Sequence, residues 1–121
     1  MRTRESEEMY LETIYLLLQK KPSLHSMDIV EHLNFAKSSV SRGVNLLKSK
    51  GYIDMDGDGT ITLTSAGRSK AEDIYDKHRV ITQFLVSLGA DVESAENNAC
   101  RMEHIISDDI FELIKKKVGD R

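Results

Sequence analysis

The chain has 121 residues, a mass of 13.7 kDa and a formal net charge of -3 at pH 7. This length suffices for one compact core, or for a small head with a helical arm, and it excludes two large independent domains. The longest apolar run, which includes residues 15–18, is far shorter than the roughly 20 residues that span a bilayer, and the N-terminus lacks a hydrophobic signal core. We therefore expect a soluble cytoplasmic protein with no membrane partner, and its single cysteine fits a reducing compartment.

Charge is divided unevenly along the chain. Residues 37–50 contain four basic side chains and no acid, whereas residues 91–112 contain seven acids and one arginine. The basic segment could face phosphate, and the acidic segment could attract cations. Each run could also be only a solvated surface.

An apolar stripe at helical spacing predicts a first helix over about residues 5–20. The stripe consists of Tyr10, Ile14, Leu17 and Leu18. Pro22 interrupts this pattern and marks the end of the helix.

Two shorter helices follow. Ser26 is a suitable N-cap for a helix through residue 33, and after a turn at residues 34–36 either Lys37 or Ser38 could cap a helix that ends near Ser49. Two short helices joined by a tight turn make a helix-turn-helix.

In the second helix of this pair, Val40, Val44 and Leu47 share one face and would lie in the core. The remaining surface carries hydroxyl and amide groups beside cations, which suits a helix whose N-terminal residues meet base edges in the major groove. The candidate DNA-binding residues are Lys37, Ser38, Ser39, Ser41, Arg42 and Asn45. The alternative is an ordinary surface helix, because serines at a helix start are common caps.

Two β-prone runs, residues 52–55 and 60–63, flank an Asp-Gly-Asp-Gly turn and predict a hairpin, the wing of a winged helix. The turn resembles the start of a calcium loop but lacks the downstream glutamate that an EF-hand requires. Gly51 ends the preceding helix. We therefore interpret residues 56–59 as a turn and not as a calcium site.

Thr64 or Ser65 is expected to cap a long helix that closes at Gly89. Its apolar stripe consists of Ile74, His78, Ile81, Leu85 and Leu88. A histidine in such a stripe is more often a hydrogen-bonded core residue than a metal ligand.

Asp91 is expected to cap the next helix, and Asp108 to begin the last one, which covers residues 110–118. The buried stripe of the helix after Asp91 consists of Val92, Ala95, Ala99, Met102 and Ile106. Cys100, Glu103 and His104 lie at the edge of this stripe, at positions i, i+3 and i+4, so that a thiolate, a carboxylate and an imidazole are neighbours on one helix. This spacing indicates half of a metal site, although Cys100 alone could equally be a small buried apolar residue.

The chain resembles the diphtheria toxin repressor family of iron- and manganese-dependent regulators over essentially its whole length. The most specific matches are residues 8–15 (EMYLETIY), 77–79 (KHR) and 100–108 (CRMEHIISD), in that order. The resemblance implies a mainly α fold with a small β wing, namely a winged-helix DNA-binding domain at residues 1–70 and a helical metal-binding and dimerisation domain at residues 71–121.

The resemblance also implies two metal sites. The main regulatory site would use Met9, Cys100, Glu103 and His104; Met9 considered alone is more often a core residue. A second site would use His78 with Glu12 and Glu96, but Thr82 replaces a glutamate and Glu96 replaces a histidine of the iron-type pattern, a departure closer to the manganese branch. Iron-type members carry a C-terminal SH3-like domain, and because the sequence ends at Arg121 we expect a short form without it.

Sulfur ligands favour ferrous iron, cobalt, nickel or zinc over manganese, so Fe(II) is our first choice of metal and Mn(II) the second. We expect a non-enzymatic repressor that binds a palindromic operator as a metal-loaded homodimer. The apolar dimer surface would be drawn from Ile105, Ile106, Ile110, Phe111 and Ile114.

Two other classes of protein compete with this interpretation. A metalloenzyme would need an open coordination position beside a substrate pocket, and no catalytic motif appears in the sequence. The more serious alternative is a metal-independent winged-helix regulator that senses redox state through Cys100, or a small molecule held by Tyr15 and His78.

Overall fold

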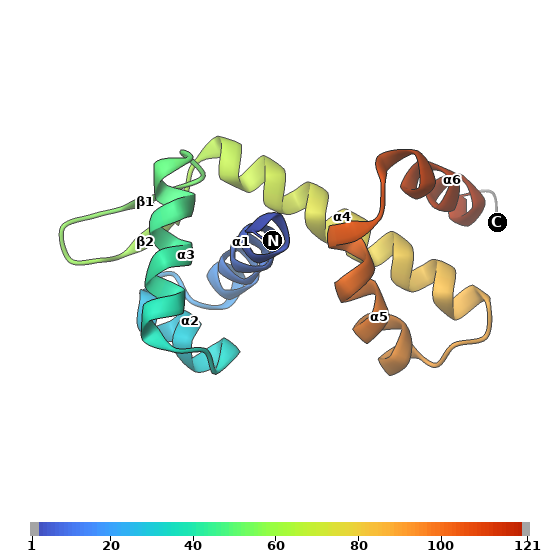
Figure 1. Ribbon diagram of the computed structural model, residues 1–121, viewed down its shortest axis with the longest axis horizontal. Coiled ribbons are helices and arrows are strands. Elements are labelled where there is room, and N and C mark those ends of the chain that lie inside the picture. Colours follow the sequence, from blue (N-terminus) through green and yellow to red (C-terminus); the bar gives the residue numbers. More distant parts are fainter. Residues whose placement is uncertain (1–2, 120–121) are drawn as a thin grey trace. The chain divides into compact units, whose positions relative to one another are not determined.

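The computed structural model describes residues 3–119, which form six helices and a two-stranded antiparallel sheet (Figure 1). The elements in chain order are α1 (Thr3–Lys20), α2 (Ser26–Leu33), α3 (Lys37–Ser49), β1 (Ile53–Met55), β2 (Ile61–Leu63), α4 (Ser65–Ser87), α5 (Val92–Ile105) and α6 (Asp108–Gly119). The predicted fold class, mainly α with a small β wing, is confirmed. Within the described part of the chain, no helix has both the length and the apolar composition needed to cross a membrane.

The chain divides into two compact units, Met1–Glu72 and Asp73–Arg121, and the boundary falls inside α4. The first unit contains α1, the helix-turn-helix of α2 and α3, and the wing of β1 and β2. Its core contains Ile14, Val40, Val44 and Leu47, as periodicity predicted, together with residues outside the predicted stripes. The apolar residues exposed by 1% or less are Leu11, Ile14, Leu24, Ile29, Val40, Val44, Leu47, Ile53, Ile61 and Ala71.

Both predicted N-caps in the helix-turn-helix are wrong by one or two residues. His25 is the N-cap of α2, and its backbone N–H donates to the carboxylate of Asp28 at 2.8 Å, so the side chain at the third helical position makes the capping bond. Ala36 is the N-cap of α3 and supplies no side-chain hydrogen bond. The first turn of α3 therefore directs backbone N–H groups outward, which gives this end of the helix a partial positive charge.

The wing has the predicted hairpin form. Ile53 pairs with Leu63 and Met55 with Ile61. One carboxylate oxygen of Asp56 accepts the backbone N–H groups of Asp58 and Thr60 at 3.1 and 2.9 Å, which closes the turn. These hydrogen bonds agree with the interpretation of residues 56–59 as a turn.

α4 begins against the base of the wing. The side chain of Thr64 accepts the backbone N–H of Gly67 at 3.0 Å, so Thr64 is the cap. A Cβ at Gly67 would lie 2.8 Å from the carbonyl carbon of Tyr52 and closer still to its oxygen, so only glycine lets the helix approach β1 this closely.

The second unit has a core of its own. It consists of Val80, Ile81, Ala99, Phe111 and Ile114, with Phe84, Leu85, Met102, Ile106 and Val118 packed around it. Leu88 and Val92 were expected to be buried but are 68% and 59% exposed. Leu88 follows the last residue of α4 and Val92 is the first residue of α5, so neither is held by a complete helical turn on both sides.

Candidate metal centre and DNA-reading helix

The placement of α5 buries a carboxylate. Asp91 caps the helix by accepting the backbone N–H of Ser94 at 2.7 Å. Ala95, Ala99 and Glu103 follow at intervals of four residues on one face, so burial of the two alanines carries Glu103 inward with them. Glu103 is 1% exposed, although the sequence had placed it at the edge of the buried stripe.

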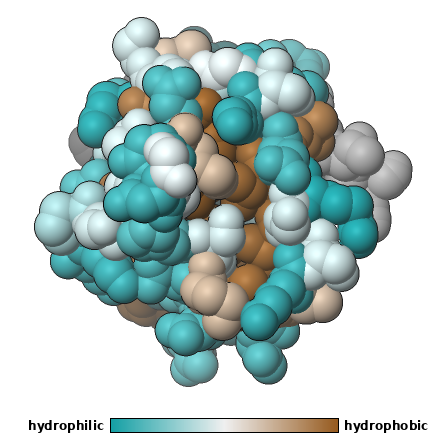
Figure 2. Space-filling view, turned by 90° about the vertical axis from the view of Figure 1, so that its left-hand side faces the viewer, coloured by the Kyte–Doolittle hydropathy of each residue, from teal (hydrophilic) through white to brown (hydrophobic). Residues whose placement is uncertain are grey.

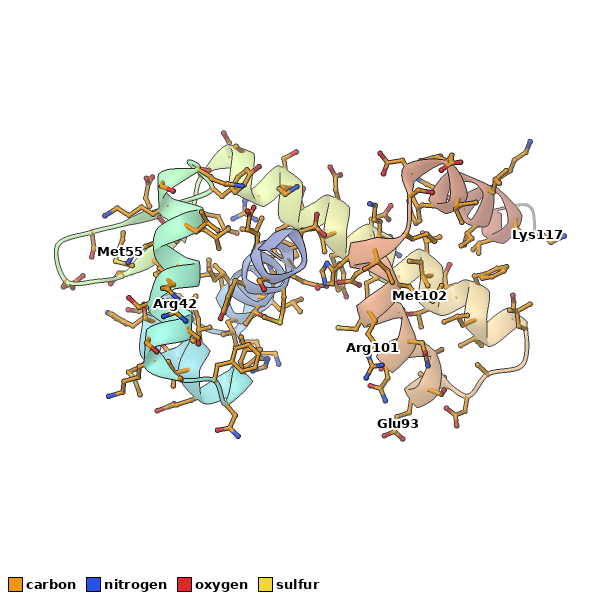
Figure 3. All side chains as sticks on the ribbon, in the orientation of Figure 1. Arg42, Met55, Glu93, Arg101, Met102 and Lys117 are labelled. Carbon is orange, nitrogen blue, oxygen red and sulfur yellow. The ribbon has the colours of Figure 1, made fainter. Side chains whose placement is uncertain are left out.

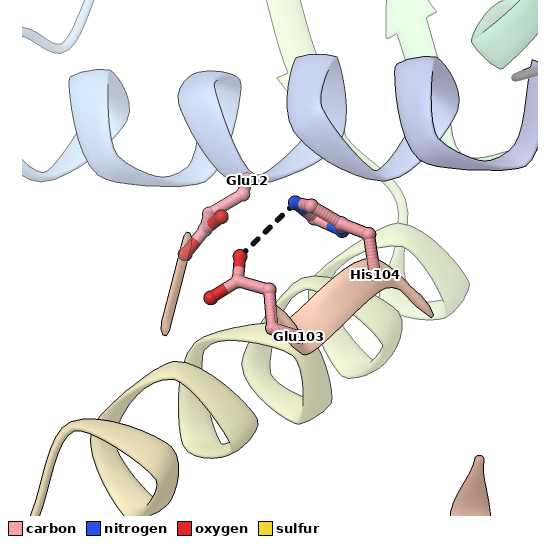
Figure 4. A group of neighbouring side chains, drawn as sticks. All are labelled: Glu12, Glu103 and His104. Carbon is pink, nitrogen blue, oxygen red and sulfur yellow. Dashed lines mark ion pairs between the residues drawn. The ribbon is translucent and has the colours of Figure 1, made fainter. Parts of the chain in front are cut away.

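The carboxylate of Glu103 lies between two imidazoles of the second unit. Its Oε1 is 2.8 Å from Nδ1 of His78 on α4, and its Oε2 is 3.2 Å from Nε2 of His104 on α5. Figure 4 draws Glu103, His104 and the α1 residue Glu12, and the dashed line marks the ion pair of Glu103 with His104. A buried carboxylate needs hydrogen bonds and compensation of its charge, and His78 supplies a hydrogen bond to Oε1 of Glu103.

The environment of His78 favours its charged form. The hydrogen bond to Glu103 raises the pKa of His78, partial burial opposes that rise, and the negative charges of Glu103 and Glu96 add to it. The ring of Tyr75 stacks on the ring of His78, with centroids 6.4 Å apart. A proton on His78 must leave before its nitrogen can bind a metal.

His78 also lines an open pocket of about 260 Å³ together with Tyr75, Arg79, Thr82, Gln83 and Glu96. The hydroxyl of Thr82 donates to the backbone carbonyl of His78 at 2.7 Å. Glu96, the expected partner of His78, shares this pocket, whereas the hydrogen-bond partner of His78 is Glu103. Sequence reasoning missed Tyr75, which lies three residues before His78 and so on the same helix face.

Cys100 precedes Glu103 by one helical turn and is exposed. Its interpretation as a small buried apolar residue is therefore wrong. In the first unit, Met9 is half-buried and Glu12 is buried, and their spacing of three residues puts them on one face of α1. Glu8, on the same helix, is also buried and lies 3.8 Å from Nζ of Lys70.

The donor set of the second unit fits a divalent transition metal. It offers a carboxylate, two imidazoles and an accessible thiol, and this mixture of oxygen, nitrogen and sulfur suits iron, cobalt, nickel and zinc. Glu103 holds the imidazole of His78 by a hydrogen bond and lies within ion-pair distance of the imidazole of His104, so the three side chains are already close to one another.

The DNA-reading face predicted for α3 is accessible. Its side chains point outward as expected, with Ser39 half-buried and Lys37, Ser38, Ser41, Arg42 and Asn45 exposed. Figure 3 shows Arg42 projecting from α3, where its guanidinium lies 3.5 Å from the hydroxyl of Ser39. Figure 2 looks at the end of the molecule that carries α3 and the wing, and hydrophilic side chains cover most of that surface around an apolar band.

The structure shows one contact to α3 from another helix that the sequence did not indicate. Tyr10 of α1 packs on Gly43 in the middle of α3, and its hydroxyl donates to the backbone carbonyl of Ser39 at 3.3 Å. Burial raises the pKa of Tyr10, and the positive charge of Arg42 opposes that rise. A glycine inside a helix costs about 1 kcal/mol relative to alanine, so a packing reason for Gly43 is expected.

Two family models match the chain in tandem. The iron dependent repressor N-terminal DNA binding domain matches residues 2–61, and the iron dependent repressor metal binding and dimerisation domain matches residues 64–121.

Individual proteins agree with these matches. An uncharacterized HTH-type transcriptional regulator of Methanocaldococcus jannaschii is 37% identical over 92% of this chain and 90% of its own length. The iron-dependent repressor IdeR of Mycobacterium tuberculosis is 34% identical over 96% of this chain, which spans only about half (51%) of that relative. A solved manganese-dependent transcriptional repressor in complex with manganese has a TM-score of 0.84 at 26% identity, covering 95% of this chain and 53% of its own. With a helix-turn-helix, a wing and a helical unit rich in metal donors, the chain belongs to the iron-dependent repressor family.

Proposed function

We propose that this protein is a transcriptional repressor, and not an enzyme, that binds a palindromic operator as a homodimer when loaded with a divalent transition metal. The observation that carries this proposal is the buried carboxylate of Glu103, held between His78 and His104 one turn from an exposed thiol. Donors grouped in this way are suited to bind a metal cation.

The proposed ligands in the second unit are Cys100, Glu103 and His104, with His78 and Glu96 available to a second ion. Met9 and Glu12 of α1 are proposed to add donors to these ions, on the strength of their chemistry and of the family resemblance. A bound divalent metal supplies the positive charge that holds such anionic groups together. Without that charge, the carboxylates repel one another.

Metal ligands that come together only in the DNA-competent conformation would make metal binding shift the protein from its inactive conformation to that one. To take the protein from mostly inactive to mostly competent, the metal must bind the competent state about 10⁴-fold more tightly, or about 5.5 kcal/mol. In that state, one α3 helix of each protomer would enter the major groove of each half-site.

Ferrous iron is the proposed signal, with manganese second, because the thiolate and the thioether are soft ligands. Zinc would also bind such donors in vitro, and often more tightly than iron, so affinity alone does not identify the metal used in the cell.

The test uses the full chain purified without oxygen. A duplex is selected from a random-sequence pool against metal-loaded protein, and its binding is then measured by gel shift with Fe(II), Mn(II), Zn(II) or a chelator. We expect tight binding with metal and at least a tenfold loss with chelator, on the order of 1.4 kcal/mol. Equal binding in all four conditions would refute the proposal.

Substitutions at the proposed ligands test where the metal binds. We expect Cys100→Ala and His104→Ala to abolish the metal-induced increase in DNA affinity while the circular dichroism spectrum is retained. Asn98→Ala, an exposed change on the same helix, and His32→Ala, an exposed histidine on α2, are the matched controls and should keep the wild-type response. Unchanged metal dependence in the Cys100 and His104 variants would contradict the assigned ligands.

A redox switch is the second candidate function, and the exposure of Cys100 favours it. In that case an oxidant would change DNA affinity, chelator would not, and Cys100→Ala would remove only the response to oxidant. The same gel-shift experiment with added peroxide distinguishes the two functions.

A further inference from the structure

α1 and the DNA-reading helix α3 pack against each other where the ring of Tyr10 meets Gly43. The ring of Tyr10 occupies the space in which residue 43 would otherwise carry a side chain, because a Cβ built on Gly43 would lie 2.5 Å from Cδ2 of that ring and closer still to Cε2. Any larger residue at position 43 must displace the ring or the helix.

A hydrogen bond fixes the same turn of α3. The hydroxyl of Tyr10 donates to the backbone carbonyl of Ser39 at 3.3 Å, and in an α-helix that carbonyl also accepts the N–H of Gly43. Arg42 lies between these two residues in sequence, and its guanidinium is 3.5 Å from the hydroxyl of Ser39. The ring of Tyr10 also meets the ring of Phe35 edge-on, with centroids 6.2 Å apart. The side chain of Tyr10 thus contacts the loop before α3 at Phe35 and the helix itself at Ser39 and Gly43.

A second bond joins the other end of α3 to α1. Glu7 forms an ion pair of 2.6 Å with Lys50, the residue that follows α3. On α1, Glu7 and Tyr10 lie three residues apart and so share a face. Glu12, a proposed ligand, is two residues beyond Tyr10, about 200° further around the helix, and faces away from α3. α1 therefore holds α3 with one face and presents a metal donor on another.

We propose that Tyr10 is the positioning residue that carries the metal response of α1 to the base-reading turn of α3. The inference rests on the proposed function, in which Met9 and Glu12 bind the regulatory ion. The ring against Gly43 sets how closely α3 approaches α1, and the bond to Ser39 sets its rotation. Together they fix the direction in which Ser39 and Arg42 project.

The experiment separates metal binding from DNA binding. Cobalt(II) serves as an air-stable probe; its affinity is measured by visible absorption without DNA. The affinity for the selected duplex is then measured by fluorescence anisotropy with and without cobalt. The ratio of the two DNA dissociation constants is the metal-induced gain.

We expect Tyr10→Phe to keep its cobalt affinity within about twofold and to reduce the metal-induced gain roughly two- to tenfold, as expected for one lost hydrogen bond. Gly43→Ala should reduce the gain by roughly tenfold or more, because the ring must move. Tyr52→Phe and Ser49→Ala are matched controls for the lost hydroxyl and for the added helix propensity, and both should keep the wild-type gain.

The double variant Tyr10→Leu with Gly43→Ala tests whether the loss in Gly43→Ala arises only from misfolding. The smaller side chain leaves room for the new Cβ, so the fold and the metal-free DNA affinity should recover while the gain stays low. A full wild-type gain in Tyr10→Phe or in the double variant would overturn the inference, and so would an equal loss of DNA affinity with and without cobalt. If wild-type protein itself shows no gain, the proposed function fails and the inference fails with it.

Discussion

A carboxylate that is 1% exposed needs compensation for its charge, and Glu103 has an imidazole at each of its oxygens. This geometry makes Glu103 the residue on which the second unit's polar cluster depends. His78 comes from α4 and His104 from α5, so the carboxylate also ties two helices together. Replacement of Glu103 by an apolar residue would remove the hydrogen-bond partner of His78 and the ion-pair partner of His104.

Arg42 is the residue of α3 best suited to read a base. Its side chain is exposed, and a guanidinium can donate two parallel hydrogen bonds to guanine. We expect Arg42→Ala to weaken specific binding by about 1–3 kcal/mol with little change in non-specific binding. Competition of the selected duplex against unrelated DNA measures both, and Arg68→Ala, an exposed change on α4, is the control. An equal loss on all sequences would mean that Arg42 contacts phosphate only.

Asp28 gives a pH dependence with a definite sign. The hydrogen bond from Lys21 lowers the pKa of Asp28 below its ordinary value of 3.8, and the bond from the backbone N–H of His25 adds to this. A lowered pKa in the folded state stabilises the fold above pH 3.8, and this contribution is lost as the pH falls through the folded-state pKa.

We therefore expect Asp28→Asn to lower the free energy of unfolding at neutral pH by about 0.5–1 kcal/mol, because the pair is partly exposed. The difference from wild type should shrink as urea titrations are carried to pH values progressively below 3.8, because the contribution of the charge is lost as the pH falls through the folded-state pKa. Glu31→Gln, an exposed change on the same helix, is the control. A difference that stays constant with pH would exclude an electrostatic origin.

At the scale of elements, the start of α4 and the base of the wing form one packed junction. Thr64 caps α4, its backbone N–H donates to the carbonyl of Tyr52 at 3.1 Å, and Gly67 packs against that same carbonyl. The orientation of the wing beside α3 therefore depends on a helix start that tolerates no side chain at position 67.

Gly67→Ala should lower the free energy of unfolding by about 1–3 kcal/mol, because the new Cβ overlaps the backbone of Tyr52. Gly57→Ala is the matched control: a Cβ there meets nothing within 4 Å, and its effect should stay within about 0.5 kcal/mol. Urea denaturation of both variants makes the comparison. Equal free energies of unfolding for the Gly67→Ala and Gly57→Ala variants would show that the junction accommodates a side chain at position 67.

The helices were predictable from the sequence because helical periodicity is local, whereas their caps were not. Whether a residue caps depends on its backbone angles, and α2 begins one residue earlier than predicted, with His25 as N-cap and its backbone N–H donating to the carboxylate of Asp28. The prediction that Leu88 and Val92 are buried was wrong for a similar reason. An apolar stripe predicts which residues share a helix face, but not how far along the helix that face is covered by other elements.

The candidate site was predictable only in part. Spacing brought Cys100, Glu103 and His104 to one helix, and the family resemblance added residues on other helices. The hydrogen bond of Glu103 to His78 and the contact of Tyr10 with Gly43 join residues 25 and 33 positions apart. Such pairs depend on tertiary packing, which no local period encodes.

For the whole molecule, the exposed apolar surface of the second unit bears on assembly. Ile105, Ile110 and Leu113 are 66%, 45% and 63% exposed, as a dimerising surface requires. Phe111 and Ile114, which the sequence assigned to that surface, are 6% and 9% exposed and belong to the core of their own unit. Both lie on the face of α6 that packs against this core.

We expect Leu113→Asp to raise the dimer dissociation constant at least about tenfold without unfolding the protein. Phe111→Ala should instead lower the free energy of unfolding by about 3–5 kcal/mol. Analytical ultracentrifugation and thermal denaturation separate the two effects, with the neighbouring exposed change Glu112→Gln as control. A Leu113→Asp protein that remains dimeric would place the interface elsewhere.

The turn of the hairpin has one more consequence. Asp54, Asp56 and Asp58 give the hairpin the same sign of charge as the sugar-phosphate strands of a duplex. Ordinary Coulomb repulsion should hold this hairpin away from those strands, so few counterions would be displaced there. The ionic-strength dependence of operator affinity would then report mainly on Lys37, Arg42 and their neighbours.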